Sequence, residues 1–329
     1  MNGSKERNSG DGYGQAAVAE NGYERNSGDG YERKSVSGDA FGSGRPVIAV
    51  ELDPPADDDA GFFLEGVRTI RDAGADLITI ADCPVGRPRA DSCVLAAKIK
   101  REYGIESLPH MTCRDRNLNA MRAALLALSI EGVHHILLVT GDPIPREERE
   151  NVKPVFQVQS RQLARIVQEM NETVFHTPFR IFGALNVNAS QFERELERAA
   201  EKEECGVTGF LTQPIHSPEA LENLKIARKT LRGVLLGGVF PIISRRNAEF
   251  LNENIAGIRV SPDIIALYDG KDREESERVA VELSLRTAKS VGPYADGLYL
   301  MTPFRRTALM AEIVRELRRP CDCGAASGT

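Results

Sequence analysis

Beyond residue 45 the chain alternates between short apolar runs and longer stretches in which apolar residues recur with helical spacing. The stretch 117–130 places Met121, Leu125 and Leu128 on one face, as an amphipathic helix does. The run 135–140 is apolar through its centre, which is typical of a strand covered on both faces. Runs of this kind predict eight strands, at 47–52, 77–81, 107–111, 135–140, 180–185, 209–212, 234–240 and 297–301.

Helices are expected between these strands, each bounded by residues suited to its ends. Gly74 and Gly104 follow two of them, while Pro218 and Ser244 open two others. The expected helices span 58–73, 90–103, 117–130, 159–170, 191–204, 218–231, 244–253 and 273–291, with a last one near 310–317. Eight strands alternating with helices predict an α/β protein of the (β/α)8 TIM barrel type. The alternative, a doubly wound open sheet, normally has a Gly-x-Gly-x-x-Gly turn after an early strand, and none is present.

The two ends of the chain differ from its centre. Residues 1–44 are rich in Gly, Ser, Asn and charge, and an eight-residue motif starting at Glu6 recurs at Glu24. Such a segment buries too little apolar surface to offset the entropy of ordering, so we predict a disordered low-complexity tail. A recruiting tail that docks through its tyrosines is the alternative. The barrel is assigned to 45–319 and a flexible C-terminal tail to 320–329.

Composition narrows the class of protein. The chain has 329 residues and a formal net charge of −6, with no clustered basic face of the kind that nucleic-acid binding needs. No apolar run approaches the ~18 residues of a membrane helix, and no signal-peptide core precedes the barrel. Six scattered cysteines fit reduced thiols, so a cytoplasmic location is expected. No metal site is expected, because Cys321 and Cys323 have no further His or Cys nearby.

Polar residues follow six of the predicted strands. Active sites of parallel barrels are built at the carboxyl ends of their strands, so these residues are expected to share one site. They are Glu51, Asp82, His110, Asp142, Asn186 and Gln213.

Four of these residues suggest particular chemistry. A carboxyl group partly desolvated at the mouth of the first strand, Glu51, would have a raised pKa and suit general acid work; the alternative is a rim carboxylate paired with an arginine. Asp142, after Gly141, offers a fixed negative charge beside a cation. Gln213 offers a donor and an acceptor to a heterocycle, or is a satisfied buried amide. His110 is a ligand donor or a hydrogen-bonded structural residue.

A series of motifs carries a resemblance to a known family. They are Glu51-Leu52-Asp53-Pro54-Pro55, Pro109-His110-Met111-Thr112-Cys113-Arg114-Asp115-Arg116-Asn117, Thr140-Gly141-Asp142-Pro143, Phe210-Leu211-Thr212-Gln213-Pro214, the stretch 238–248 and the stretch 297–304. In this order and spacing the chain resembles methylenetetrahydrofolate reductase, a flavin-dependent (β/α)8 barrel enzyme, from about residue 47 to 317. It looks most like the reductase halves that are fused to a homocysteine methyltransferase in some bacteria, without that methyltransferase half.

The resemblance implies an activity in one-carbon and methionine metabolism. Reduced FAD would deliver hydride to 5,10-methylenetetrahydrofolate and give 5-methyltetrahydrofolate. Glu51 matches the family's general acid, Asp142 matches the aspartate that contacts the pterin and tunes the flavin, and Gln213 matches the folate-contacting glutamine. The resemblance places further FAD contacts at or near His110, Asp142, Asn186, Glu195, Lys202 and Asp82.

The electron donor and partners stay open at this point. NADH or NADPH is the implied co-substrate, while a protein electron donor, a methyltransferase partner and a homo-oligomer are alternatives. Some reductases carry a threonine at the end of the second strand where this chain has Ala81, and some carry a tyrosine where it has the segment 155–160. A non-catalytic barrel subunit that binds folate or flavin is the second hypothesis. An aldolase-type barrel is disfavoured, because no lysine stands at a strand end.

Overall fold

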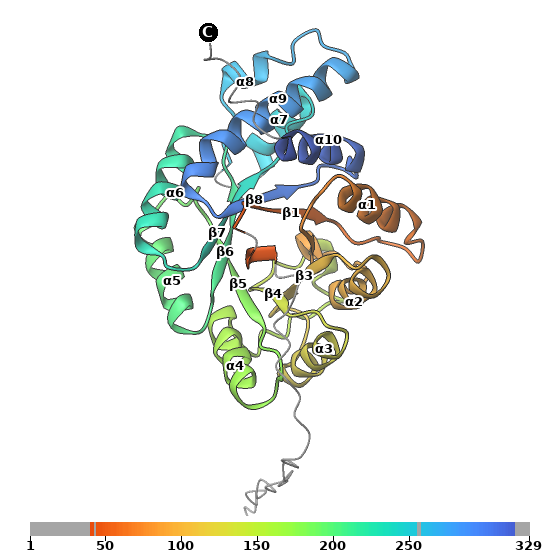
Figure 1. Cartoon of the computed structure of the whole chain (residues 1–329), viewed down its shortest axis with the longest axis vertical. Coiled ribbons are helices and arrows are strands. Elements are labelled where there is room, and N and C mark those ends of the chain that lie inside the picture. The colour runs from red at the N-terminus through yellow and green to blue at the C-terminus, as the bar shows by residue number, and fades with distance from the viewer. Residues whose placement is uncertain (1–39, 43, 255–257, 320–329) are drawn as a thin grey trace, which may run out of the picture. The chain divides into compact units, whose positions relative to one another are not determined.

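The computed structural model describes residues 40–42, 44–254 and 258–319, and within them the strands close into a parallel barrel (Figure 1). Each strand pairs with its neighbours in sequence, and β8 returns to pair with β1. The strands are β1 (Val47–Leu52), β2 (Leu77–Ile80), β3 (Glu106–Thr112), β4 (His135–Val139), β5 (Arg180–Leu185), β6 (Gly209–Pro214), β7 (Val234–Val239) and β8 (Gly297–Met301). The predicted (β/α)8 TIM barrel is therefore confirmed.

Helices follow the strands and form the outer ring (Figure 1). Their ends follow local capping: Asp91 and Asn117 accept hydrogen bonds from the first turns of α2 and α3, and Gly104 ends α2 in a left-handed conformation. The helices are α1 (Gly61–Asp72), α2 (Ser92–Tyr103), α3 (Leu118–Ile130), α4 (Ser160–Thr173), α5 (Phe192–Glu204), α6 (Pro218–Thr230), α7 (Arg245–Asn254), α8 (Pro262–Ala266), α9 (Arg273–Val291) and α10 (Thr307–Arg318).

Several element boundaries differ by a few residues from the sequence prediction, and two of these differences have a visible cause. The first helix begins at Gly61 and not at residue 58, because the Asp59 carboxylate accepts from the Gly61 N–H and holds the preceding residues in a turn. Strand β6 runs to Pro214, past the expected end at residue 212, with an irregular register opposite β7. This extension carries Gln213 within the strand.

The interior of the barrel is filled by alternate side chains of the strands. They form one apolar cluster that includes Leu77, Leu108, Phe182 and Leu236, all fully buried. Space for the Phe182 ring comes from Gly209, where a Cβ would lie 2.6 Å from the ring. The other strand faces pack against the helices in a larger cluster. The barrel is a packed scaffold, so open space for a ligand is left to its ends.

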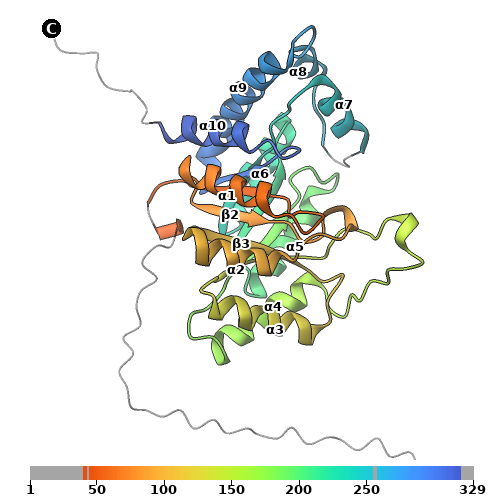
Figure 2. The ribbon, with the colours of Figure 1, turned by 90° about the vertical axis from the view of Figure 1, so that its right-hand side faces the viewer.

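An extension lies between β7 and β8. It contains α7, the short α8, which the sequence did not predict, and the long α9. Its own small core includes Ile242, Leu251, Val260 and Tyr268. Figure 2 shows α7 and the segment between β4 and α4 projecting on the same side of the barrel.

The amino end of the barrel is closed by a 3-10 turn, η1 (Ala40–Gly42). Its Phe41 ring lies 5.6 Å from His135 and 5.4 Å from Phe182, and the Arg180 guanidinium stacks over it. Residues 40–42 were assigned to the tail from the sequence, but they form this turn. The predicted disorder of residues 1–39 and the flexible end at 320–329 lie outside the described residues.

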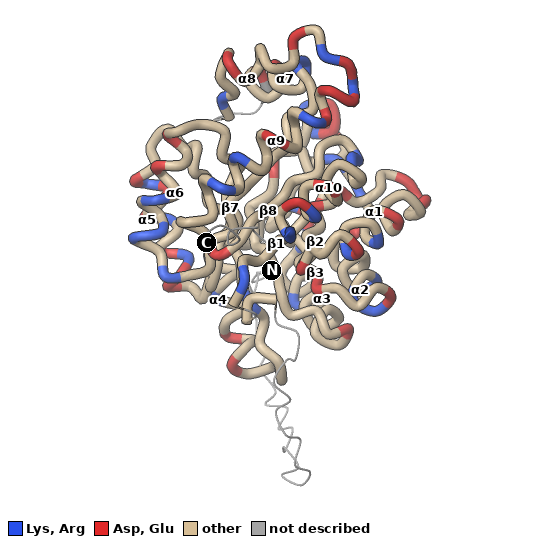
Figure 3. Tube along the Cα trace, turned by 45° about the horizontal axis from the view of Figure 1, so that its top comes forward, with Lys and Arg blue, Asp and Glu red and all other residues tan. Residues whose placement is uncertain are grey.

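The outer helices carry both signs of charge. Figure 3 shows acidic and basic positions interspersed along α5 and α6. Within the described part of the chain, no helix has the length and apolar character required to cross a bilayer.

Candidate active site at the carboxyl end of the barrel

A cavity of about 400 Å³ opens where the strands end. Five of the six predicted strand-end residues line it together. Parallel strands bring their carboxyl ends to one edge, which is why residues far apart in sequence meet here. These five are Glu51, Asp82, His110, Asp142 and Gln213.

Glu51 lies on the wall of this cavity with its side chain 20% exposed. Burial, together with repulsion from Asp53, raises its pKa to about 7, although a hydrogen bond from Tyr299 acts in the opposite direction. No arginine pairs with it among the described residues. Its hydrogen-bond donor is the Tyr299 phenol, and the neutral His110 has its Nε2 at 3.6 Å, beyond hydrogen-bond distance. The alternative of a rim carboxylate paired with an arginine is therefore wrong. A carboxyl group with this pKa can hold a proton at neutral pH and release it.

His110 faces the same carboxylate from β3. Burial lowers its pKa to about 3, so the imidazole is neutral. Its Nε2 is buried and has no hydrogen-bond partner among the described residues. A buried polar atom without a partner is costly, so this nitrogen is free for a ligand.

Asp142 is held in place by the β2–α2 loop. Its Oδ2 accepts from the Val85 backbone N–H at 2.8 Å, and Val85 itself has a left-handed φ of 49°. Gly141 before it has a φ of 96°, and a Cβ there would lie 3.0 Å from the Thr112 side chain. Glycine at position 141 is thus favoured by crowding as well as by backbone conformation.

Two arginines join the loops around Asp142, and the sequence analysis did not assign them a role. Arg114 is 1% exposed, and its guanidinium donates to the carbonyls of Asp142 at 2.8 Å and Cys83 at 3.2 Å. The same guanidinium also binds the Asp115 carboxylate through two N–H groups. Arg116 binds both Asp82 and Asp91. A fully buried guanidinium needs a partner for each donor, so three loops are tied to one another. The motif in which they occur was visible, but their targets lie about 30 residues away in sequence.

Asp82 serves this same network. Its Oδ2 accepts from the Thr112 N–H at 2.8 Å, the Thr112 hydroxyl at 3.1 Å and Arg116 at 2.7 Å. The carboxylate therefore joins the ends of β2 and β3.

Gln213 is exposed at the mouth, which excludes the alternative of a satisfied buried amide. Its backbone carbonyl accepts from the Thr212 hydroxyl, and no hydrogen bond holds its side-chain amide among the described residues. The amide therefore has both donor and acceptor available at the cavity.

Asn186 lies apart from the cavity, in a polar groove of about 730 Å³. Ala184, two residues earlier in the sequence, lines the cavity, so cavity and groove meet at the end of β5. Arg194, Arg198 and Arg259 also line the groove. Arg198 is bound to the Glu195 carboxylate, so Arg194 and Arg259 are the guanidinium groups that suit the groove to an anion such as a phosphate.

Glu195 and Lys202, predicted as cofactor contacts, have backbone partners at the end of β5. Glu195 accepts from the Asn186 N–H at 3.1 Å, and Lys202 donates to the Ala184 carbonyl at 2.9 Å. Burial lowers the pKa of Lys202. In this arrangement both side chains position the strand end that separates cavity from groove.

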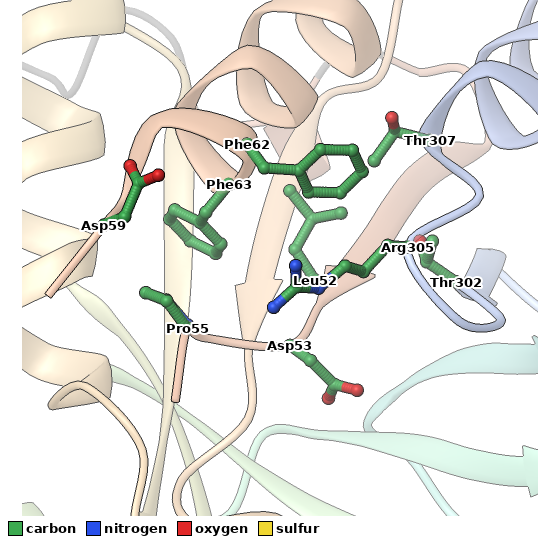
Figure 4. A pocket seen from close by; sticks show the side chains of 9 residues that line it. All are labelled: Leu52, Asp53, Pro55, Asp59, Phe62, Phe63, Thr302, Arg305 and Thr307. Atoms are coloured by element: carbon green, nitrogen blue, oxygen red, sulfur yellow. The ribbon is translucent and has the colours of Figure 1, made fainter. Parts of the chain in front are cut away.

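A smaller pocket of about 40 Å³ lies beside Leu52 and Asp53, at the end of β1. Figure 4 shows it between the start of α1, which supplies Phe62 and Phe63, and the segment after β8, which supplies Thr302 and Arg305. Arg305 stacks over the Phe62 ring at 5.5 Å. Its volume suits water and not an organic substrate.

Comparison with known proteins defines the family. The family model described as "Methylenetetrahydrofolate reductase" matches residues 38–318 of this chain. The chain belongs to the methylenetetrahydrofolate reductase family. This confirms the family resemblance that the sequence motifs indicated. The match covers the whole barrel.

Two similar proteins share little sequence identity with this chain. A 5,10-methylenetetrahydrofolate reductase from Pectobacterium carotovorum subsp. carotovorum is 22% identical over 190 residues, which cover 57% of this chain and 60% of that protein. Among solved structures, an uncharacterized protein from Clostridium thermocellum described as binding two copies of 5-methyl-5,6,7,8-tetrahydrofolic acid has a TM-score of 0.57. It is 13% identical, and the alignment covers 84% of this chain and 97% of that one, which indicates a shared fold.

Proposed function

We propose that this member of the reductase family reduces 5,10-methylenetetrahydrofolate to 5-methyltetrahydrofolate with FAD as its cofactor. The observation that carries the proposal is Glu51, a half-buried carboxyl group with a pKa of about 7 on the wall of an open cavity. Asp142 and Gln213 line the same cavity. A subunit that only binds its ligand has no need of an acid at this position.

The residues present fit a flavin dinucleotide. His110 offers a buried ring nitrogen without a hydrogen-bond partner among the described residues at the cavity. The neighbouring groove offers Arg194 and Arg259 for a diphosphate. Asn186 stands where the groove begins. Reduced FAD, when bound, would supply the hydride.

The side chains of this chain supply the rest of the chemistry. Protonated Glu51 would give its proton to a ring nitrogen of the folate and so favour opening to the iminium cation. Asp142, fixed by the Val85 N–H and by Arg114, would present its charge to that cation without rearranging. Gln213 would hold the edge of the heterocycle through its amide.

The name of the folate-binding structural neighbour supports folate as the substrate class, since that protein shares the fold. Methionine supply and a cytoplasmic location follow from the proposed reaction. NADH or NADPH is the proposed electron donor, with a protein partner as the alternative.

The test is a visible spectrum of the purified full-length protein after FAD addition and desalting, followed under anaerobic conditions by NADH or NADPH and then the folate. We expect retained flavin that the nicotinamide bleaches and the folate restores. Flavin that only dithionite reduces, but that the folate still reoxidises, identifies a reductase with a protein electron donor. Absence of retained flavin contradicts the proposal and favours a folate-binding subunit.

A further inference from the structure

Tyr299 lies beside the carboxyl group of Glu51 because of the way the barrel closes. It is on β8, paired in register with Ala49 of β1, two residues before Glu51. Residues two apart on a strand face the same side, so Tyr299 and Glu51 both point into the interior. Tyr299 is 7% exposed and lines the cavity.

The contact between the two side chains is a hydrogen bond. The Tyr299 phenol donates to Glu51 Oε2, and His110 Nε2 lies 3.6 Å from the same oxygen. No hydrogen bond from a described residue reaches Oε1 of Glu51. The two carboxyl oxygens are therefore in different environments, one held and one open.

The charged and titratable groups around Glu51 come from three elements. Burial and the negative charge of Asp53, just past β1, both oppose ionisation of Glu51. The hydrogen bond from Tyr299 of β8 favours ionisation. His110 from β3 is neutral and adds no charge. Asp82 and Asp142 stand elsewhere on the cavity wall.

We propose that Tyr299 is a positioning residue for Glu51: its phenol holds Oε2 and leaves Oε1 as the oxygen that carries the acid proton. The inference rests on the proposed function. In the proton transfer, the O–H bond of Glu51 breaks and an N–H bond of the folate forms. The electron pair stays on the carboxylate, where the Tyr299 O–H stabilises it. Water from the open mouth of the cavity then restores the proton.

Removal of the phenol has a definite direction of effect. The bond favours the ionised carboxylate, so its loss raises the pKa of Glu51. A hydrogen bond to a charged group changes an acid equilibrium by roughly tenfold, so we expect an upward move of roughly one pH unit. The acid stays protonated to higher pH but is a weaker proton donor.

The experiment is a ¹³C NMR titration of the full-length, FAD-supplemented protein with labelled glutamate carboxyls. The Glu51 signal is identified by its absence in Glu51→Gln. We expect the pKa of Glu51 to rise in Tyr299→Phe and to stay unchanged in the matched control Tyr103→Phe. Tyr103 is the last residue of the outer helix α2, and its ring stacks against Arg71 of α1. An unchanged pKa in Tyr299→Phe, or an equal rise in Tyr103→Phe, overturns the inference.

A second measurement keeps the tyrosine in place. Incorporation of 3-fluorotyrosine makes each phenol a stronger donor, so the pKa of Glu51 is expected to fall in the native chain and not in labelled Tyr299→Phe. A fall of the same size in both proteins overturns the inference. Where Tyr299→Phe folds poorly, the labelled and unlabelled native chains are compared directly, and an unchanged pKa of Glu51 overturns the inference.

The pH dependence of folate-driven flavin reoxidation separates the two proposals. Activity requires protonated Glu51, so its alkaline limb is expected to move to higher pH in Tyr299→Phe, with a lower kcat and little change in KM. A limb that does not move overturns the role of Tyr299. If no folate reaction occurs while the NMR titration still shows the rise, the reductase proposal fails and the Tyr299–Glu51 coupling stands.

Discussion

Two half-buried carboxyl groups, one at each end of the barrel, have opposite surroundings. Asp76, before β2, accepts from the Ile48 N–H at 2.8 Å and pairs with both Arg45 and Arg318. Glu51, at the end of β1, has one phenol as its hydrogen-bond donor, and its pKa is raised to about 7. At the amino end two arginines balance the negative charge of Asp76. At the carboxyl end no such partner is present among the described residues, and ionisation of Glu51 is unfavourable. Saturated ion pairing stabilises a fold, whereas an acid that must lose and regain a proton requires incomplete pairing.

The two ends also differ in how they are closed. At the amino end Phe41 covers the interior, with Arg180 stacked over its ring. At the carboxyl end the interior opens into the cavity, and the loops around it contain strained backbone. The described non-glycine residues with positive φ all belong to carboxyl-end loops: Cys83, Val85, Phe156, Phe304 and Arg305. Such strain is maintained by cross-links of the kind that Arg114 makes.

The largest expected effect comes from removing the acid at the carboxyl end. Glu51→Gln preserves the shape but cannot give a proton, so folate-driven reoxidation of the flavin is expected to fall by about 10³-fold. Flavin retention should be unchanged. Stopped-flow absorbance measures the rate, and Glu65→Gln on the exposed side of α1 is the control. Full activity in Glu51→Gln contradicts the assigned role.

Removing the carboxylate at the amino end is expected to affect stability and not activity. Asp76→Ala removes the only carboxylate that pairs with Arg318 among the described residues and leaves the Ile48 N–H unsatisfied, so the free energy of unfolding should fall by about 3 kcal/mol. Urea denaturation measures it. Asp72→Ala, which breaks an exposed pair with Arg71, should cost well under 1 kcal/mol. Equal losses in the two variants are the contrary result.

The raised pKa of Glu51 predicts a dependence of stability on pH. Its folded-state pKa of about 7 exceeds the unfolded value of 4.5, so the stability from neutral Glu51 is full below pH 4.5 and is lost as pH rises through about 7. Glu51→Gln, neutral at every pH, should therefore become more stable than the native chain above pH 7, by about 3 kcal/mol. Urea midpoints compared across pH test this; parallel curves for the two proteins contradict it.

A smaller effect is expected from the backbone beside Asp142. In Gly141→Ala, left-handed strain and contact with Thr112 should cost about 1–2 kcal/mol and displace Asp142, which lowers the folate rate by about tenfold. Gly104→Ala is the matched control, since its φ is 66° but nothing lies within 4 Å of the added Cβ. It should lose stability alone. Equal rates in the two variants would show that crowding at residue 141 does not set the position of Asp142.

Sequence pattern alone determined the fold to a large extent. Apolar runs covered on both faces and amphipathic helices between them are local signals, so the eight strands and the barrel class were predicted with end errors of a few residues. The short α8 was missed, because five residues are too few for a periodic pattern. The end of β6 depends on a register irregularity opposite β7, which the sequence of β6 alone does not reveal.

Sequence also determined which residues stand at the carboxyl ends, since order along parallel strands places them at one edge. Tertiary structure decided what each of them can do. The pKa of Glu51 is raised because the closed barrel buries its carboxyl group and Asp53 lies nearby. Its hydrogen-bond donor is the Tyr299 phenol, 248 residues away, in place of an arginine. Asn186 lines a separate groove and not the cavity. A pKa and a free hydrogen-bonding atom depend on burial and on partners from distant strands, and these exist only when the barrel has closed.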